Sequence, residues 1–274
     1  MLEYIGYLCA SLAITSSLIG LLSVFAFRTH IRNWIRKKPE KYPGLTVISP
    51  QRGKIDSDNI DAVLKQNYPG AWEVIFVTTK DDASLPQLHH YAQKYKHVKI
   101  AIADDVVQLA ATKEIHRCQK NNNLLTAIEA ASPETEVYVI VDADARPFSD
   151  WLSNLVAPLA DGNAKLGAVT SARIYLPGKG LASLVQVLWI LISAMFLVGK
   201  HRYIWGGGLA IPKAVFEKAH LGRSLEGQEG CSITTDDMNI LNALRSRGYE
   251  TLFVPDCLVL RHPPAKKETL AHVI

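Results

Sequence analysis

The chain has 274 residues, of which 48% are apolar and 20% are charged, and its net charge at pH 7 is +4. This composition excludes a disordered tail, a collagen-like fibre and a disulfide-stapled miniprotein, and the charge is too small to argue for nucleic-acid binding. The length suffices for one or two domains with a sizeable core. The mean hydropathy of +0.07 is high for a purely soluble enzyme, so membrane segments are considered first.

The first predicted element is an apolar helix over residues 4–27, a stretch without any charged residue. A helix of that length rises about 36 Å, which is enough to cross a hydrocarbon core of about 30 Å. Six basic residues and one acid follow between 28 and 41, and this basic flank predicts a cytoplasmic location for everything after it. We therefore expect a transmembrane anchor over 1–27 and a basic juxtamembrane collar over 28–43. A buried core helix is the alternative.

Strand and helix patterns then alternate along the chain. Short apolar runs predict strands over 45–49, 72–78, 97–102 and 137–141. Helical patterns predict helices over 55–66, 84–95, 120–131 and 149–159. This alternation predicts an α/β fold with a mixed, mainly parallel sheet over 44–274, in which ligands bind beyond the carboxyl ends of the strands.

The strand over 137–141 leads into Asp142-Ala143-Asp144. Residues i and i+2 of an extended chain point to the same side, so the two carboxylates can act together. Paired carboxylates at the ligand-binding edge of a sheet suit a divalent cation, which can bridge a nucleotide diphosphate. A solvated acidic turn is the alternative interpretation.

Further polar segments have both a functional and a structural interpretation. Asp236 and Asp237 precede a predicted helix that Thr235 could cap, and one of them could act as a general base. Asp82 follows a strand and could contact a nucleotide or only begin a helix.

Two more segments could lie near a ligand. Lys120, Asn122 and Asn123 open a helix with a cation and amides, which suits phosphate or ribose contacts but is also an ordinary polar helix start. Glycines 206–208 follow Trp205 and would let the backbone approach a ligand closely, unless they form only a flexible loop.

The order of these segments resembles a family 2-type glycosyltransferase of the GT-A fold, and most closely the ceramide glucosyltransferase-like group. The resemblance covers residues 44 to the end of the chain. It implies a Rossmann-like nucleotide-sugar domain and a divalent cation, Mn²⁺ or Mg²⁺. It also implies inverting transfer of a hexose, with UDP-glucose as the expected donor, to a lipid hydroxyl such as that of ceramide.

The resemblance also assigns roles to individual residues. It implies that the nucleotide-sugar is contacted by Asp82, Lys120, Asn122, Asn123 and Asp142. It implies that Asp142 and Asp144 hold the metal and that Asp237, beside Asp236, is the catalytic base. The acceptor region is implied to include Trp205, Gly206 and Gly207.

A second uncharged run covers residues 180–199 and could by hydropathy also span a membrane. A single crossing there would place Asp144 and Asp237 on opposite sides of the bilayer, although both must reach the reacting atoms. We therefore expect an interfacial or re-entrant helix that guides a lipid acceptor, with a soluble core helix as the alternative. The expected partners are a nucleotide-sugar donor, a lipid acceptor and the membrane, without nucleic acid.

One feature of the resembling family is missing. That family has a Gln-x-x-Arg-Trp-like motif after the last strand, followed by membrane helices, whereas no Arg-Trp pair occurs in these 274 residues. By position the motif would begin near Ile274, so we expect a sequence truncated at its C-terminus.

Other functions stay open at this point. A polysaccharide synthase or a polyprenyl-phosphate glycosyltransferase is the alternative transferase, and an inactive membrane-anchored nucleotide-binding protein is the non-enzymatic one. A dehalogenase-type phosphatase also carries Asp-x-Asp after a strand. Arg146 stands where that class has Thr or Val, and the strand is fourth in order instead of first.

Overall fold

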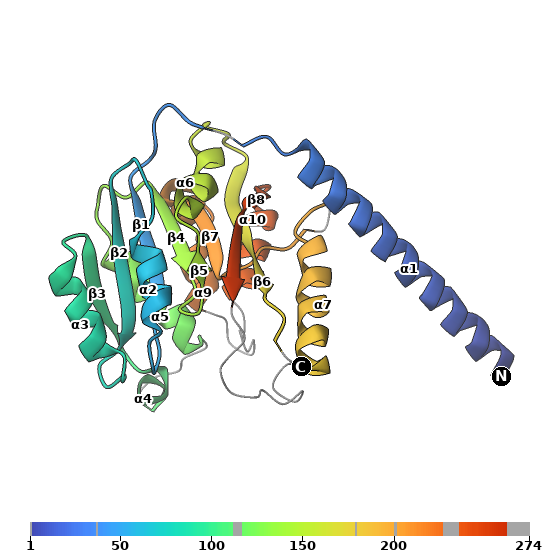
Figure 1. Ribbon diagram of the computed structural model, residues 1–274, viewed down its shortest axis with the longest axis horizontal. Helices are drawn as coiled ribbons and strands as arrows, with labels where there is room; N and C mark the ends of the chain where they lie inside the picture. Colours follow the sequence, from blue (N-terminus) through green and yellow to red (C-terminus); the bar gives the residue numbers. More distant parts are fainter. Residues whose placement is uncertain are drawn as a thin grey trace.

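The computed structural model describes residues 2–36, 38–111, 117–178, 180–199, 202–226 and 236–261. Its centre is an eight-stranded mixed sheet with the strand order β3-β2-β1-β4-β7-β6-β8-β5 (Figure 1). The strands are Leu45–Pro50 (β1), Trp72–Thr79 (β2), Val98–Ala103 (β3), Val137–Val141 (β4), Arg146–Pro147 (β5), Leu166–Tyr175 (β6), Gly208–Pro212 (β7) and Glu250–Arg261 (β8).

The first half of the sheet is parallel, because β2 pairs with both β3 and β1, and β1 pairs with β4. β7 then runs antiparallel between β4 and β6. β8 is parallel to β6, and the short β5 is antiparallel to β8. The prediction of an α/β fold with a mixed, mainly parallel sheet is confirmed.

Helices cover both faces of the sheet and extend beyond it. They are Leu2–Asn33 (α1), Ser57–Leu64 (α2), Leu85–Lys94 (α3), Val106–Ala110 (α4), Gln119–Glu129 (α5), Trp151–Val156 (α6), Leu181–Met195 (α7), Lys213–Lys218 (α8), Leu221–Glu226 (α9) and Asp236–Ser246 (α10). A 3₁₀ turn, Ala157–Leu159, follows α6. The predicted helix over 149–159 therefore changes to a 3₁₀ turn near Pro158, whose ring removes a backbone donor.

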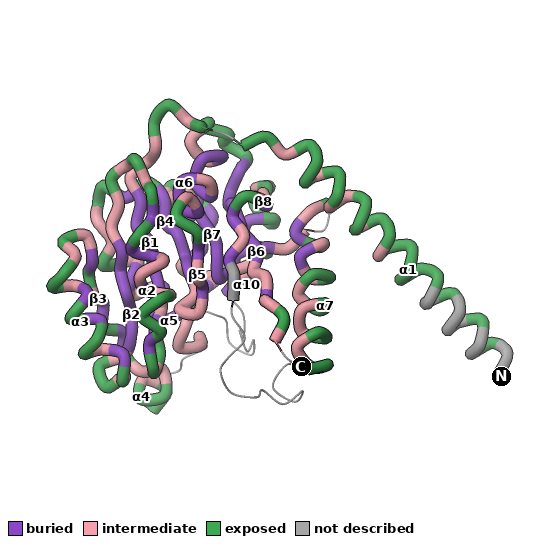
Figure 2. Tube along the Cα trace, in the orientation of Figure 1, coloured by how far each residue is buried: buried purple, intermediate pink, exposed green. Residues whose placement is uncertain are grey.

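The core has two layers because alternate residues of each strand face opposite sides of the sheet. On one face, Val47 and Phe76 pack against α2, α3 and α6. On the other face, Ile48 and Ile75 pack against α5, α8, α9 and α10. All four strand residues are at most 1% exposed. The strands are accordingly the most continuously buried part of the chain (Figure 2).

The sequence patterns located the first four strands correctly but not the later ones. Neither β6 nor β7 was predicted, and the glycine loop expected over 206–208 is a turn only at 206–207, since Gly208 begins β7. Glycine is depleted in strands, so a strand that starts on one is poorly marked in the sequence.

The N-terminal helix extends away from the sheet (Figure 1). Within the described residues it is the one helix long and apolar enough to cross a membrane, over Ile14–Asn33. It continues past the predicted anchor boundary at 27, so Arg28 and Arg32 of the collar are helical.

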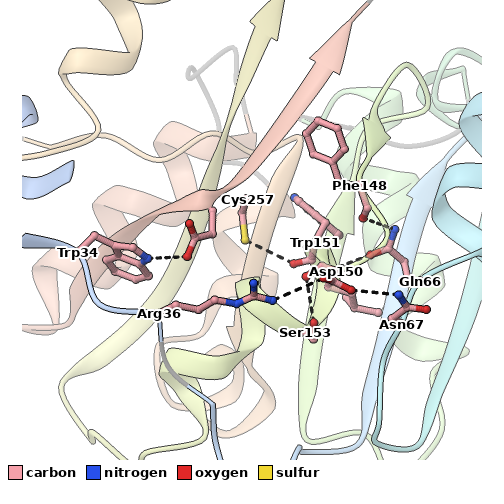
Figure 3. A network of polar contacts seen from close by, with 11 residues as sticks. Trp34, Arg36, Gln66, Asn67, Phe148, Asp150, Trp151, Ser153 and Cys257 are labelled. Atoms are coloured by element: carbon pink, nitrogen blue, oxygen red, sulfur yellow. Dashed lines mark hydrogen bonds and ion pairs between the residues drawn. The ribbon is translucent and has the colours of Figure 1, made fainter. Parts of the chain in front are cut away.

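The end of α1 is packed on the sheet domain. Phe27 stacks on Phe253 of β8 with ring centroids 5.9 Å apart. The indole N–H of Trp34 donates to Asp256 Oδ2 at 2.8 Å (Figure 3). The chain direction at the end of α1 is therefore fixed relative to β8.

Candidate active site

Three aspartates and one glycine follow the carboxyl ends of the parallel strands. Gly53 follows β1, Asp82 follows β2, Asp104 follows β3 and Asp142 follows β4. Because parallel strands end at one edge of their sheet, these residues line the edge at which such folds bind ligands. The predicted placement of Asp82 and the Asp-x-Asp segment after their strands is therefore confirmed.

A half-buried cation joins two carboxylates at this edge. Lys120, at the start of α5, places Nζ 2.8 Å from Asp142 Oδ1 and 3.0 Å from Asp236 Oδ2. We call these three residues the Lys120 cluster. They come from α5, the end of β4 and the start of α10, so tertiary folding alone brings them together. Asp236 Oδ2 has no hydrogen-bond partner of good geometry, so charge holds that contact.

The two carboxylates of the Lys120 cluster stabilise the charged form of the lysine. Burial disfavours the ammonium form of Lys120, but the charges of Asp142 and Asp236 outweigh it and raise the pKa of Lys120 above its usual range. The lysine is therefore a permanent cation at neutral pH. It can bind an anion such as a diphosphate if one of its carboxylate contacts is exchanged.

Two glycines allow the backbone to approach the cluster. A Cβ atom added to Gly206 would lie 2.6 Å from Asp236 Oδ2, and one added to Gly207 would overlap the Asp142 carboxylate. The backbone N–H of Asp142 also donates to the Gly207 carbonyl at 3.1 Å. The expected close approach is thus made to the protein's own carboxylates, while contact with an acceptor stays a prediction.

Asp144 lies against a different cation. Its Oδ2 is 3.5 Å from Nη1 of Arg173, a residue of β6. The Arg173 guanidinium lies over the rings of Tyr175, at 5.0 Å, and Trp205, at 5.6 Å. Arg173 was not among the predicted site residues, although it is the one charged residue of the strand.

A small pocket opens beside Arg173. Its volume is about 40 Å³, and it is lined by Ala172, Arg173, Ile190, Ser193, Ala194, Leu197, Tyr203 and Trp205. Burial, assisted by the charge of Asp237, raises the pKa of Tyr203 to about 12, so its phenol is neutral at physiological pH. The pocket therefore joins an apolar wall on α7 to polar groups next to the Asp-x-Asp segment.

Asp82 organises the loops after β1 and β2. Its Oδ1 accepts hydrogen bonds from the backbone N–H groups of Gly53, at 2.9 Å, and Ser84, at 2.8 Å. Burial opposes ionisation of Asp82, but hydrogen bonds from Ser84 and Gly53 outweigh it and hold the pKa of Asp82 below its usual range. Asp82 is therefore ionised, and its role toward a nucleotide stays a prediction.

The two asparagines predicted near the donor are buried and turned toward the loop after β3. Asn122 accepts from Arg117 Nε at 2.8 Å and donates to the Asp104 carbonyl at 2.8 Å. Asn123 accepts from Gln119 at 2.7 Å. The partners in these bonds are outside the Lys120 cluster, and through them the asparagines hold the loop after β3 against the start of α5.

The two acids at the start of α10, Asp236 and Asp237, have different surroundings. Asp236 is 7% exposed and lies in the Lys120 cluster. Asp237 is less buried, and its Oδ1 accepts from the N–H of Met238 at 2.8 Å. The expected capping residue, Thr235, lies outside the described residues. Of the two acids, Asp236 is the one that Lys120 contacts.

The donor set suits a hard cation that arrives with a phosphate ligand. Within the part of the chain that the structure describes, no three His, Cys, Asp or Glu side chains converge as a metal cage. Magnesium is commonly held by one or two carboxylates together with substrate phosphates. Asp142 and Asp144 supply that number, and each now lies against a cationic side chain that a metal would replace.

The sequence profile of glycosyl transferase family 21 matches residues 8–207. The chain belongs to glycosyl transferase family 21. The match covers most of the chain, including the Asp-x-Asp segment, Lys120 and Gly207, and it confirms the resemblance to the ceramide glucosyltransferase-like group. No curated protein matches the sequence.

Solved structures confirm the fold of this family 21 chain. S. aureus TarS in complex with UDP-GlcNAc is 13% identical with a TM-score of 0.53, over 83% of this chain and 60% of that chain. The 4-diphosphocytidyl-2C-methyl-D-erythritol synthase of Anaerococcus prevotii is 12% identical with a TM-score of 0.50, over 84% of this chain and 93% of that chain. At these identities the likeness concerns the fold alone.

Proposed function

We propose that the protein is a membrane-bound inverting glycosyltransferase. It transfers a hexose from a nucleotide-sugar, with UDP-glucose the first candidate, to a lipid hydroxyl such as that of ceramide. The observation that carries the proposal is the Lys120 cluster at the carboxyl edge of the sheet, in a chain of glycosyl transferase family 21. The TarS structure, bound to UDP-GlcNAc, supports a nucleotide-sugar as the donor class.

The donor diphosphate would lie against the Lys120 cluster and the Asp-x-Asp segment. Asp142 and Asp144 would hold Mn²⁺ or Mg²⁺, which would neutralise negative charge on the departing nucleoside diphosphate. Lys120, which now contacts Asp142, would exchange that carboxylate for a phosphate oxygen of the donor. A cation fixed in advance at the place where charge develops is a common source of rate enhancement.

Asp237 would act as the base. The acceptor oxygen forms a bond to the anomeric carbon, the bond from that carbon to the diphosphate oxygen breaks, and Asp237 takes the hydroxyl proton. Asp236 is less suitable because it lies against Lys120 at 3.0 Å.

A lipid acceptor is supported by the surroundings of the pocket beside Arg173. One face of α7 exposes large apolar side chains at the helical spacing of three and four residues: Leu181, Leu184, Val185, Leu188, Trp189 and Ile192. The other face supplies Ile190 and Ala194 to the pocket. An acyl chain held by the membrane would reach the site along this helix.

The same surface supports membrane binding. Phe27 of α1 packs against the cluster that contains Ala194 and Leu197 at the end of α7, so the anchor and the apolar helix lie on one side of the sheet (Figure 1). We propose that α1 anchors the protein, that α7 lies in the interface, and that the basic collar places the catalytic domain in the cytoplasm. Nucleotide-sugars are found in that compartment.

Release of UDP from UDP-glucose in the presence of Mn²⁺ tests this function. The enzyme in liposomes is given ceramide, a polyprenyl phosphate or a soluble sugar, and Asp144→Ala serves as the metal-site variant. The proposal expects release that depends on ceramide and is lost in the variant. Equal release with soluble and lipid acceptors would contradict the lipid specificity, and absence of release with every acceptor would favour a non-enzymatic nucleotide-binding protein.

A further inference from the structure

The segment that carries Asp142 and Asp144 lies along helix α2 and is tied to it at two places. Near the start of α2, Asn59 contacts the segment at Ala143 and Arg146. Near its end, Gln66 contacts the backbone of residues 148 and 152. Because Ile60, Val63 and Leu64 bury the other face of α2 in the core, the helix is a rigid support for the segment.

The Asn59 amide is bonded on both sides. Its Nδ2 donates to the carbonyl of Ala143 at 3.2 Å, and its Oδ1 accepts from Arg146 Nε at 3.1 Å. A guanidinium can only donate and a carbonyl can only accept, so the amide fits in one orientation. Asn59 therefore links the Ala143–Asp144 peptide to the side chain of Arg146.

The other backbone groups around this turn have separate partners. The N–H of Asp142 donates to Gly207, and the N–H of Ala145 donates to the Asp142 carbonyl. Ala145 itself is fully buried in the core. The Ala143–Asp144 peptide lies between these fixed points, and its rotation would move the Asp144 carboxylate from its present place beside Arg173.

The far end of the segment is held in the same manner. Gln66 Oε1 accepts from the N–H of Leu152 at 2.9 Å, and Gln66 Nε2 donates to the Phe148 carbonyl at 2.8 Å (Figure 3). Residues 143–152 thus run along α2, and they are held at one end by the Asn59 amide and at the other by the Gln66 amide. Movement of the segment along the helix would break the hydrogen bonds at both ends.

We propose that Asn59 is a positioning residue for the metal and diphosphate site. It touches no reacting atom, and it acts by fixing the Ala143 carbonyl so that Asp142 and Asp144 present their carboxylates together. The inference rests on the proposed function, because it assigns to those carboxylates the binding of a cation and a diphosphate. Residues that orient metal ligands typically contribute about 10–100-fold to metal affinity.

Asn59→Asp tests the role with little change in shape. The aspartate keeps an acceptor for Arg146 but loses the donor to Ala143. The matched control is Asp58→Asn on the same helix. It removes the ion pair in which Asp58 Oδ2 lies 3.2 Å from Arg146 Nη1, and the Asp58 side chain is 70% exposed. Binding of UDP with MnCl₂ is measured by calorimetry on the full chain in detergent, and thermal unfolding is measured alongside.

The expected result is at least about tenfold weaker UDP–Mn²⁺ binding by Asn59→Asp, with a melting temperature close to that of the Asp58→Asn control. The control should bind as the wild type does. If Asn59→Asp fails to fold, Arg146→Lys is measured instead, because it removes the hydrogen bond from Arg146 Nε to Asn59 Oδ1. Weaker UDP–Mn²⁺ binding is again expected.

Two results would overturn the proposal. One is wild-type affinity in the folded variant, and the other is a loss of affinity matched by Asp58→Asn. Failure of the wild type itself to bind UDP with Mn²⁺ would instead contradict the proposed function, so the two failures are distinguishable.

Discussion

Replacing Lys120 with methionine would remove the cation that joins two carboxylates while keeping an unbranched side chain that is only one atom shorter. In the native structure the Lys120 ammonium lies 2.8 Å from Asp142 and 3.0 Å from Asp236. Without it, both acids lie close together in a partly dry site, and their mutual repulsion is no longer compensated. We therefore expect Lys120→Met to lower the free energy of unfolding.

The size of the effect follows from burial. Removing one partner of a fully buried ion pair costs about 3–5 kcal/mol, whereas an exposed pair contributes about 0–1 kcal/mol. The side chains of Lys120, Asp142 and Asp236 are 33%, 21% and 10% exposed, which lies between these limits. We expect a loss of about 2 kcal/mol, or about 4–8 °C in melting temperature for a domain of this size.

Thermal unfolding in detergent measures the change. The control is Lys65→Met, since Lys65 is 66% exposed and pairs only with its helical neighbour Asp61 in the interactions described; it should melt with the wild type. Adding Asp236→Asn to Lys120→Met removes one of the repelling charges and should restore part of the loss. Wild-type stability of Lys120→Met, or a double variant whose losses simply add, would refute the reasoning.

Three further predictions concern other contacts. The pKa of Asp82 is lowered in the folded state, so its charge stabilises the fold above about pH 4 and this contribution is lost as the pH falls through the lower folded pKa. Asp82→Asn should therefore melt below the wild type at pH 7, and the difference should close under about pH 4; a constant difference would contradict this. Gly207→Ala should reduce UDP–Mn²⁺ binding by more than about tenfold, because its Cβ would displace the Asp142 carboxylate, while Gly222→Ala, whose nearest neighbours would be 3.8 Å away, should bind normally. Trp34→Phe removes a hydrogen bond to β8 and should lower the melting temperature by about 2–4 °C, and an unchanged value would show that this bond contributes nothing.

The sequence predicted the parallel half of the sheet because its strands are short, mostly apolar runs separated by helical patterns. That half also places Asp82 and Asp142 at the ligand edge, so the donor side of the site followed from strand order. The antiparallel β7 and the long β6 were not predicted, and with them the position of Arg173 was missed.

Contacts across the chain could not be predicted from local pattern. Asn59 and Ala143 are 84 residues apart, and Lys120 reaches Asp236 from another helix. The sequence indicated that the glycines allow close approach, but it could not show that Gly206 and Gly207 approach the site's own carboxylates. Such pairs are decided by tertiary packing, which propensity and spacing do not encode.

Transfer of label from UDP-[¹⁴C]glucose into lipid tests the central claim most directly. The full chain in ceramide-containing liposomes is incubated with Mn²⁺, the lipids are extracted, and the wild type is compared with Asp142→Asn. The proposed function predicts label in the lipid fraction with the wild type and its loss in the variant, because Asp142 lies in both the Lys120 cluster and the Asp-x-Asp segment. Equal labelling by both proteins, or no lipid label from a folded wild type, would contradict it.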